Sequence, residues 1–200
     1  MLKLIVITVS LTSIFLSSSA FASHLPTPVY HYDDEEDSVV LQHKTAKDII
    51  PRITLNGRTY RFEENTLVDI QRALGGEIHH TQRTEWICFY NRANQQALWF
   101  LSNKEIQHGR LSGVAISQNG FSAGCTETDK PLSIIYSVPG PGAQHQTLSR
   151  YFDTPAGAGS PVSFYCEYAL EKETTQLNGL QYYFTNGKVS EILFSQVTTM

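Results

Sequence analysis

The sequence predicts an α+β protein of two tandem units, each a short helix packed on an antiparallel meander of three to four strands. One ten-residue pattern occurs twice: Gly109–Gln118 reads GRLSGVAISQ, and Gly187–Gln196, which begins 78 residues later, reads GKVSEILFSQ. At the same offset, Trp86–Tyr90 (WICFY) matches Phe164–Tyr168 (FYCEY). In both halves a helix-like segment precedes the strands. Two blocks at one offset in one element order favour an internal duplication, the alternative being two meanders that are alike only in composition.

Residues 1–22 have the pattern of a signal peptide. Lys3 supplies a positive charge, Leu4–Leu16 is an apolar run, and Ala20-Phe21-Ala22 has the small-x-small form of a cleavage site. The alternative is an uncleaved anchor, but the run is shorter than the roughly 20 residues that span a bilayer. We therefore expect cleavage after Ala22 and a periplasmic or secreted protein with no remaining membrane span. The residue directly after the cleavage site is Ser23 and not a cysteine, so lipidation is not expected.

The charge of the mature chain argues against two classes of partner. The whole chain has a net charge of −4, and removal of Lys3 with the signal peptide makes it −5. Nucleic-acid binding and adhesion to anionic lipid both call for clustered Lys and Arg, which this sequence lacks. We therefore expect no nucleic-acid partner. The histidines show no metal-ligand spacing, so no metal is expected, and no cofactor is expected either.

Residues 23–48 are expected to form a flexible acidic tail. Asp33–Asp37 is a run of five acidic residues, and like charges packed together repel one another and stay solvated. An alternative for Val39–Gln42 is local docking as an edge strand. His24 and His31 precede the acidic run, and loose binding of a divalent ion there is the alternative to a solvated tail.

Repeat unit one is expected over residues 49–118. Asn56-Gly57 interrupts an alternating run and favours a hairpin turn. Asn65 or Thr66 can cap a helix in which Leu67, Ile70 and Leu74 recur at helical spacing, and Gly75-Gly76 can end it. Three strands separated by short polar turns must then form an antiparallel meander, since parallel strands need a long crossover. These strands are predicted at 86–90, 97–102 and 109–117.

Residues 119–144 are expected to be a linker, which includes the sequence VPGPG at 138–142. Repeat unit two is expected over residues 145–200. It contains a helix at 145–152 that ends before Pro155, a strand at 162–168, and a hairpin at 180–197 with Asn186-Gly187 at its turn.

The three cysteines allow at most one intramolecular disulfide. An exported compartment favours disulfide formation, and an odd number leaves one thiol over. We predict a Cys88–Cys125 bridge within unit one and a free Cys166, with Cys125–Cys166 as the close alternative.

Aromatic side chains are dense on the predicted strands, and alternation sends neighbours to opposite faces of a sheet. Ile192 and Phe194 share one parity, which favours their side as the core. Tyr182 and Phe184 are expected to join this core, and Tyr183 is then expected to lie outward, with Trp99 as its counterpart in unit one. Exposed aromatic clusters mark interfaces. The alternative is a thin core supplemented by cross-strand aromatic pairs.

The order of a short helix ending in LGG, then WICFY, LWFLS and GRLSGVAIS, resembles the helix-plus-meander unit of the outer-membrane assembly protein BamE. The tandem form is similar to the beta-lactamase inhibitory protein (BLIP), which has two such units in one chain. The resemblance covers roughly residues 50–118 and 140–197. It implies an exported, non-catalytic protein that presents a sheet or loops to another protein. The chain lacks the lipidated cysteine of the BamE type, and no binding residue is carried over.

One motif suggests catalysis instead. Gly120–Gly124 reads GFSAG and matches G-x-S-x-G, in which Ser122 would be a nucleophile. The remaining triad members would have to be Asp129 and His145, both on one linker, and the residues after Ser122 are poor helix formers. We expect a binding protein with an inhibitor, immunity or assembly role. A small serine hydrolase using Ser122 is the alternative, and a structural envelope component is a third possibility.

Overall fold

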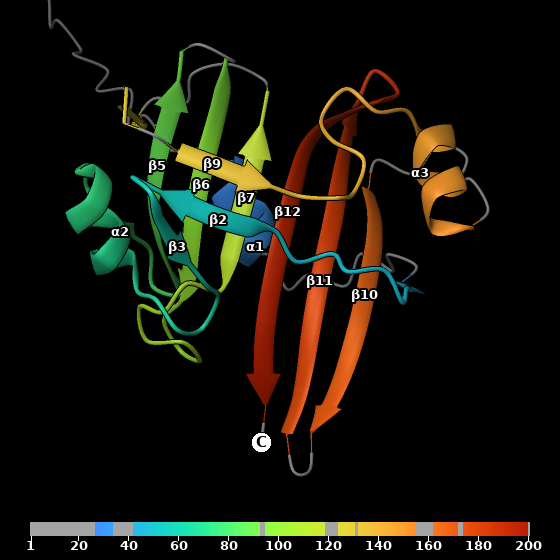
Figure 1. Cartoon of the computed structure of the whole chain (residues 1–200), viewed down its shortest axis with the longest axis horizontal. Coiled ribbons are helices and arrows are strands. Elements are labelled where there is room, and N and C mark those ends of the chain that lie inside the picture. The colour runs from blue at the N-terminus through green and yellow to red at the C-terminus, as the bar shows by residue number, and fades with distance from the viewer. Residues whose placement is uncertain are drawn as a thin grey trace, which may run out of the picture.

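The computed structural model describes residues 27–33, 42–92, 95–118, 124–130, 132–154, 162–171 and 174–199. The chain is an α+β protein that consists mostly of strands (Figure 1). Its helices are α1 (Thr27–Asp33), α2 (Leu67–Leu74) and α3 (His145–Phe152). Its strands are β1 (Gln42–Lys44), β2 (Arg52–Leu55), β3 (Arg58–Tyr60), β4 (His79–His80), β5 (Thr84–Asn91), β6 (Gln96–Asn103), β7 (Gly113–Ser117), β8 (Thr126–Glu127), β9 (Leu132–Ile135), β10 (Val162–Glu171), β11 (Thr174–Thr185) and β12 (Lys188–Thr199).

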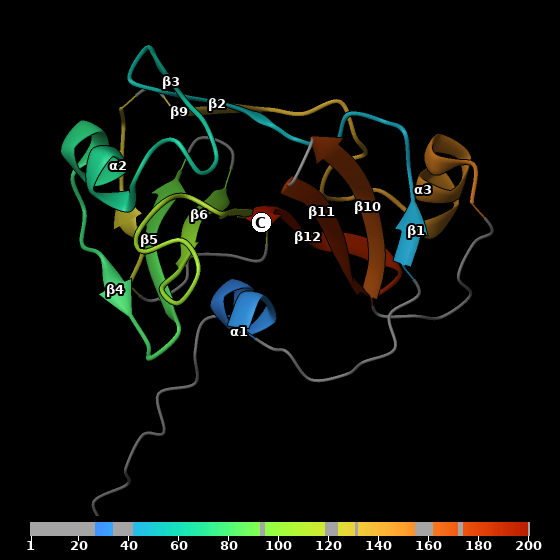
Figure 2. The same cartoon turned by 90° about the horizontal axis from the view of Figure 1, so that it is seen from below.

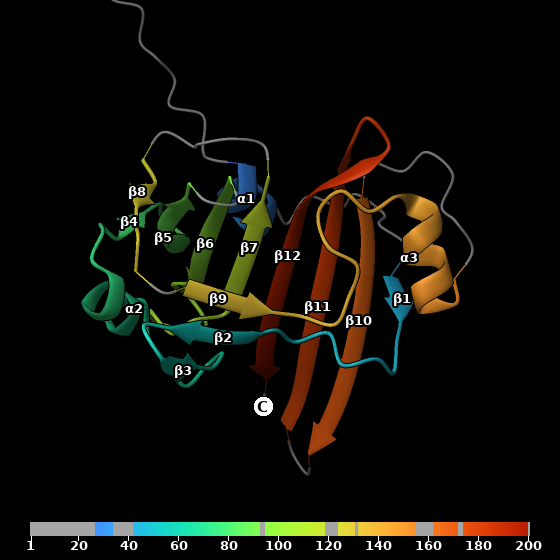
Figure 3. The ribbon, with the colours of Figure 1, turned by 45° about the horizontal axis from the view of Figure 1, so that its top comes forward.

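Nine strands form one sheet in the order β1-β10-β11-β12-β7-β6-β5-β4, with β8 beside β5. The pairing is antiparallel except where β1 meets β10 and β8 meets β5. The two halves join where Gly113–Ser117 of β7 pairs with Glu191–Ser195 of β12. A second sheet, in the order β3-β2-β9, crosses over the first (Figures 1 and 3).

The nine-stranded sheet has two faces that are covered differently. Its inner face, which carries Phe100, Tyr182 and Ile192, packs with residues of α2, α3 and the three-stranded sheet in one core. Its outer face carries Trp86, Trp99 and Leu193, which form a smaller cluster with Val29 of α1. Figure 2 shows α1 on one side of the nine-stranded sheet and the three-stranded sheet on the other.

In the first half, the turn and helix-capping residues predicted from the sequence adopt the expected local structures. Asn56 (φ 48°) and Gly57 (φ 77°) make the β2–β3 turn in the left-handed conformation, which Asn and Gly adopt at low cost. Thr66 caps α2 in a capping box: the Thr66 side chain accepts a hydrogen bond from the Asp69 backbone N–H, and the Asp69 side chain accepts one from the Thr66 backbone N–H. Gly75, at φ 86°, ends the helix.

The strand predictions were confirmed with shifted ends. β7 begins at Gly113 and not at Gly109, because His108 and Gly109 have positive φ and turn the chain before the ladder starts. The backbone carbonyl of Gly109 accepts a hydrogen bond from Leu67, at the start of α2. In the second half, α3 has the predicted bounds, and β11 and β12 extend beyond the predicted hairpin at both of its open ends.

The expected tail and linker both contain regular structure, which corrects two expectations. Thr27–Asp33 is a helix, and Gln42–Lys44 is an edge strand parallel to β10. Within the expected linker, Leu132–Ile135 pairs with β2, and Val138 is buried in the inner core. The physical reason is that a few apolar side chains in each polar stretch find a partner surface made by distant strands. The acidic residues 34–37 and the signal-peptide segment lie outside the described residues.

Candidate binding surfaces

Trp99 lies on the outer face, on the side opposite Tyr182, as alternation predicted. It is nevertheless only 1% exposed, because α1 covers it and its neighbours. The expectation that Trp99 is open to a partner was therefore wrong. The sequence signal that was missed is the pair Val29 and Tyr32, which are spaced three residues apart and so lie on one face of a helix.

The contact between α1 and the sheet is specific. The hydroxyls of Tyr32 and Ser112 are hydrogen bonded at 2.5 Å. The Tyr32 ring lies on Gly113, where an added Cβ would come within 2.8 Å of a ring carbon and 3.1 Å of Leu101 Cβ. A glycine at position 113 is thus what allows the ring to reach the sheet.

Tyr183 is on the same outer face and is half-buried. Its ring packs at the border of the cluster around Trp99, and its hydroxyl donates a hydrogen bond to the Gln181 side-chain oxygen. Part of the Tyr183 side chain therefore stays accessible, while the polar end is held in place by its neighbour.

The outer face of β10, β11 and β12 carries an apolar row that crosses all three strands. Tyr168 pairs with Leu177, and Leu177 pairs with Val197, so the three side chains lie side by side. We call these three residues the Tyr168 row. Tyr168 is 45% exposed, and Leu177 and Val197 are half-buried. The ammonium of Lys44 lies 5.4 Å from the Tyr168 ring centroid, a cation–π contact at the sheet edge.

The predicted disulfide is present on the outer face. Cys88 and Cys125 are bridged, with Cα atoms 4.6 Å apart, and Cys88 pairs across the strands with Trp99. The bridge ties the segment that leads into β8 to strand β5. Cys166 is free, as predicted, and its side chain is buried opposite Gly179.

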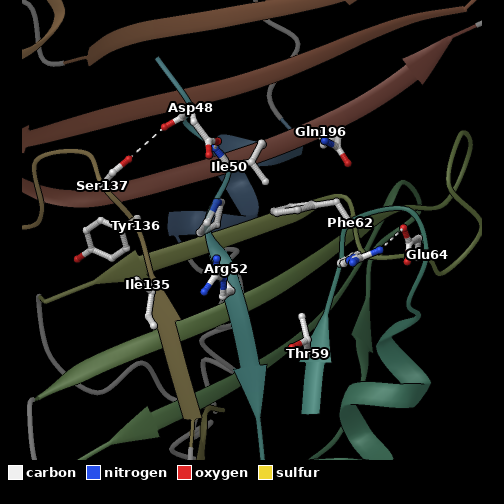
Figure 4. A pocket seen from close by; sticks show the side chains of 12 residues that line it. Asp48, Ile50, Arg52, Thr59, Phe62, Glu64, Ile135, Tyr136, Ser137 and Gln196 are labelled. Atoms are coloured by element: carbon white, nitrogen blue, oxygen red, sulfur yellow. Dashed lines mark hydrogen bonds and ion pairs between the residues drawn. The ribbon is translucent and has the colours of Figure 1, made fainter. Parts of the chain in front are cut away.

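On the inner-face side, a cavity of about 670 Å³ lies where the three-stranded sheet meets β12 (Figure 4). Its charged lining residues are Arg52, Arg61, Asp48 and Glu64. Its other lining residues are Ile50, Pro51, Thr59, Phe62, Ile135, Tyr136, Ser137 and Gln196.

The charges around this cavity are unevenly paired. Arg61 Nη1 lies 3.3 Å from Glu64 Oε1, but both side chains are mostly exposed, so this ion pair contributes little stability. Arg52 is exposed, and its side chain makes no hydrogen bond or ion pair within the described part of the chain. Burial raises the pKa of Tyr136 above its ordinary value.

Of the three residues considered for a catalytic triad, the structure describes Asp129 and His145. Ser122 lies outside the described residues. Asp129 is exposed, and the ring of His145 stacks on Phe184 with centroids 3.5 Å apart. The described residues contain no group of three His, Cys, Asp or Glu side chains that could hold a metal ion. His79 instead stacks on Trp86, with centroids 5.6 Å apart.

No helix within the described ranges has the length and apolar character needed to cross a membrane. No protein-family model matches the chain, and neither a curated protein nor a solved structure matches it.

Proposed function

We propose that the chain is an exported, non-catalytic protein-binding module that presents the outer face of β10–β12 to a protein partner. The observation that carries the proposal is the Tyr168 row. Its exposed aromatic ring stands at one end of the row, next to the half-buried Leu177 and Val197, and an exposed ring beside aliphatic side chains is typical of an interface anchor. Tyr183 extends this surface toward the first half, whereas the buried Trp99 supports the sheet from beneath α1.

The proposal includes a tandem origin. In each half an eight-residue helix precedes an antiparallel meander, β4–β7 after α2 and β10–β12 after α3, and the last strands of the two halves, β7 and β12, pair with each other. The pairing lets α2 and α3 lie on the same side of one continuous sheet. On the other side, α1 covers the first half, and the outer face of β10–β12 remains for binding. This arrangement supports the resemblance to the BamE and BLIP type of unit, and with it an inhibitor, immunity or assembly role.

The test is capture of a partner from envelope extract with tagged protein, followed by measurement of affinity for the purified partner. Tyr168→Ala and Tyr183→Ala should each weaken binding, by about 30-fold if the ring is a hot spot worth about 2 kcal/mol. The matched control is Ile106→Ala, because Ile106 is 53% exposed in the loop between β6 and β7, away from this face. Equal binding by all three variants would contradict the proposed surface.

The competing hydrolase hypothesis has its own experiment. A panel of ester substrates is assayed with the unaltered protein and with Ser122→Ala. We expect no turnover by either protein. Turnover that disappears in Ser122→Ala would replace the binding proposal with a catalytic one.

Export is proposed from the signal-peptide pattern. The intact mass of the protein recovered from the envelope or medium should correspond to a chain that begins at Ser23. A full-length mass in the envelope fraction would contradict cleavage.

A further inference from the structure

We propose that the cavity between the three-stranded sheet and β12 binds an organic monocarboxylate, with Arg52 and Arg61 holding the carboxylate. The ligand class has three parts: one carboxylate, an apolar body and a hydrogen-bond donor. A free N-acylated amino acid and the C-terminal residue of a peptide both have this chemistry. The inference does not depend on the protein-binding proposal, which concerns the opposite face of the nine-stranded sheet.

The two arginines are brought together by strand register. Thr54 of β2 pairs with Thr59 of β3 and Ile53 pairs with Tyr60, so the next position places Arg52 opposite Arg61. Alternation puts both side chains on the same face as Thr59, and both line the cavity. Like charges directly opposite each other are unfavourable, and a bound anion relieves this repulsion.

The lining favours one negative charge over two. Asp48 and Glu64 already balance Arg52 and Arg61 in number, and Glu64 is paired with Arg61. A single carboxylate can be held by the unpaired Arg52 and by the remaining donors of Arg61, whose planar guanidinium suits bidentate contact. A doubly charged phosphate would also meet repulsion from the two carboxylates.

The remaining lining residues suit an apolar body with a polar group. Ile135, which is 59% exposed, lies across the strands from Arg52, and Tyr136 and Phe62 add ring surface (Figure 4). Gln196 Nε2 donates to Asn178 Oδ1 at 2.8 Å. This leaves the Gln196 side-chain oxygen as an acceptor at the edge of the cavity for an N–H of the ligand. The volume of about 670 Å³ is within the usual range for small-molecule sites.

The experiment titrates the purified protein with N-acetyl-L-phenylalanine and follows the arginine side-chain N–H signals by NMR. The amide of the same compound, which lacks the carboxylate, is the ligand control, and inorganic phosphate is the anion control. A peptide with an acetylated N-terminus and a free C-terminal phenylalanine distinguishes the two ligand sources, a peptide C-terminus and a free N-acylated amino acid. Tighter binding of the peptide than of the free acid identifies a chain end as the source, and weaker binding identifies a free acid.

Arg52→Gln should lower the affinity for N-acetylphenylalanine by about ten-fold or more, the usual effect of losing charge-assisted hydrogen bonds. Arg52→Lys should bind with intermediate affinity, because lysine keeps the positive charge but lacks the planar guanidinium that makes two parallel hydrogen bonds to a carboxylate. Arg92→Gln removes an arginine outside the cavity, one that pairs with Glu127, and should bind like the unaltered protein.

Four results would overturn the inference: no saturable binding of the acid, equal binding of the amide, equal loss in Arg92→Gln, or tighter binding of phosphate than of the acid. If Arg52→Gln does not fold, the comparison of acid with amide on the unaltered protein still decides the question.

Discussion

Tyr182 has a fully buried ring and a hydroxyl without a hydrogen-bond partner among the described residues. The ring packs edge-on against Tyr165 and Phe152, with centroids 5.9 and 6.2 Å away. Burial, and then the neighbouring tyrosines, raise the pKa of Tyr182 well above its ordinary value. An unpaired buried hydroxyl costs free energy, so this residue contributes through its ring.

Tyr182→Phe should therefore leave the free energy of unfolding unchanged or raise it by up to about 1 kcal/mol. Chemical denaturation measures this directly. Tyr165→Phe is the matched control and should lower the free energy of unfolding, because the Tyr165 hydroxyl is 3.4 Å from Thr154 Oγ1 and within hydrogen-bonding distance. A loss above about 1 kcal/mol in Tyr182→Phe would mean that the hydroxyl has a partner, such as a buried water.

Asp69 makes the start of α2 sensitive to pH. The hydrogen bond from the Thr66 backbone N–H lowers the pKa of Asp69, and the Thr66 hydroxyl and Arg72 act in the same direction. Because the folded pKa lies below the unfolded one, the carboxylate stabilises the fold above the unfolded pKa. This contribution is lost as the pH falls through the folded pKa.

The difference in free energy of unfolding between the unaltered protein and Asp69→Asn should thus be positive near pH 6 and shrink below about pH 4. Denaturant titrations at several pH values measure it. Thr66→Ser, which keeps the capping hydroxyl, should retain the same pH dependence. A difference that does not vary with pH would show that the Asp69 charge has no part in capping.

At the scale of the element, the docking of α1 decides whether the first half of the outer face is open. The helix has seven residues, too few to be stable alone, so its structure depends on the packing of Val29 and Tyr32 against the sheet. Its contact strands are β5, β6, β7 and β12.

Gly113→Ala should displace α1, since the new Cβ would meet the Tyr32 ring at 2.8 Å. Tryptophan emission should shift to longer wavelength as Trp99 becomes hydrated, and the free energy of unfolding should fall by about 1–3 kcal/mol. In a Tyr32→Ala background the same substitution should cost less, which a double-mutant cycle measures. Additive effects would show that the ring does not contact position 113.

At the scale of the whole molecule, the two halves share one core. β7 and β12 pair over five positions, and the inner core includes Leu55 and Phe100 from the first half and Phe152 and Phe194 from the second. A unit of about 75 residues has little core of its own, so each half depends on the other for burial.

The protein should consequently unfold in one cooperative transition, and residues 49–118 expressed alone should not fold. Native-state hydrogen exchange should give similar opening free energies for the central amides of β6 and β11. Two separate transitions, or a folded fragment with dispersed NMR signals, would contradict a shared core.

Most of the local structure was predictable from neighbouring residues. The Asn56-Gly57 turn, the Thr66 cap, the Gly75 stop and α3 depend on short-range backbone preferences, which are present in the sequence itself. Tyr182 and Tyr183 were assigned to the inner and outer faces because successive side chains on a strand point to opposite faces of the sheet. The Cys88–Cys125 pair was predicted from cysteine number and repeat position, with one alternative left open.

The candidate sites were decided by long-range contacts that no local pattern contains. Trp99 is buried because a helix about 70 positions earlier reaches it, and β9 is a strand because β2 offers it an edge about 80 positions away. Arg52 and Arg61 face one cavity only after β12 supplies its far wall. Backbone preferences and periodicity, which can be read from neighbouring residues, specify α2, α3, the hairpin turns and the sheet faces. Only the tertiary structure decided which faces are covered, because burial depends on what distant segments bring to each surface.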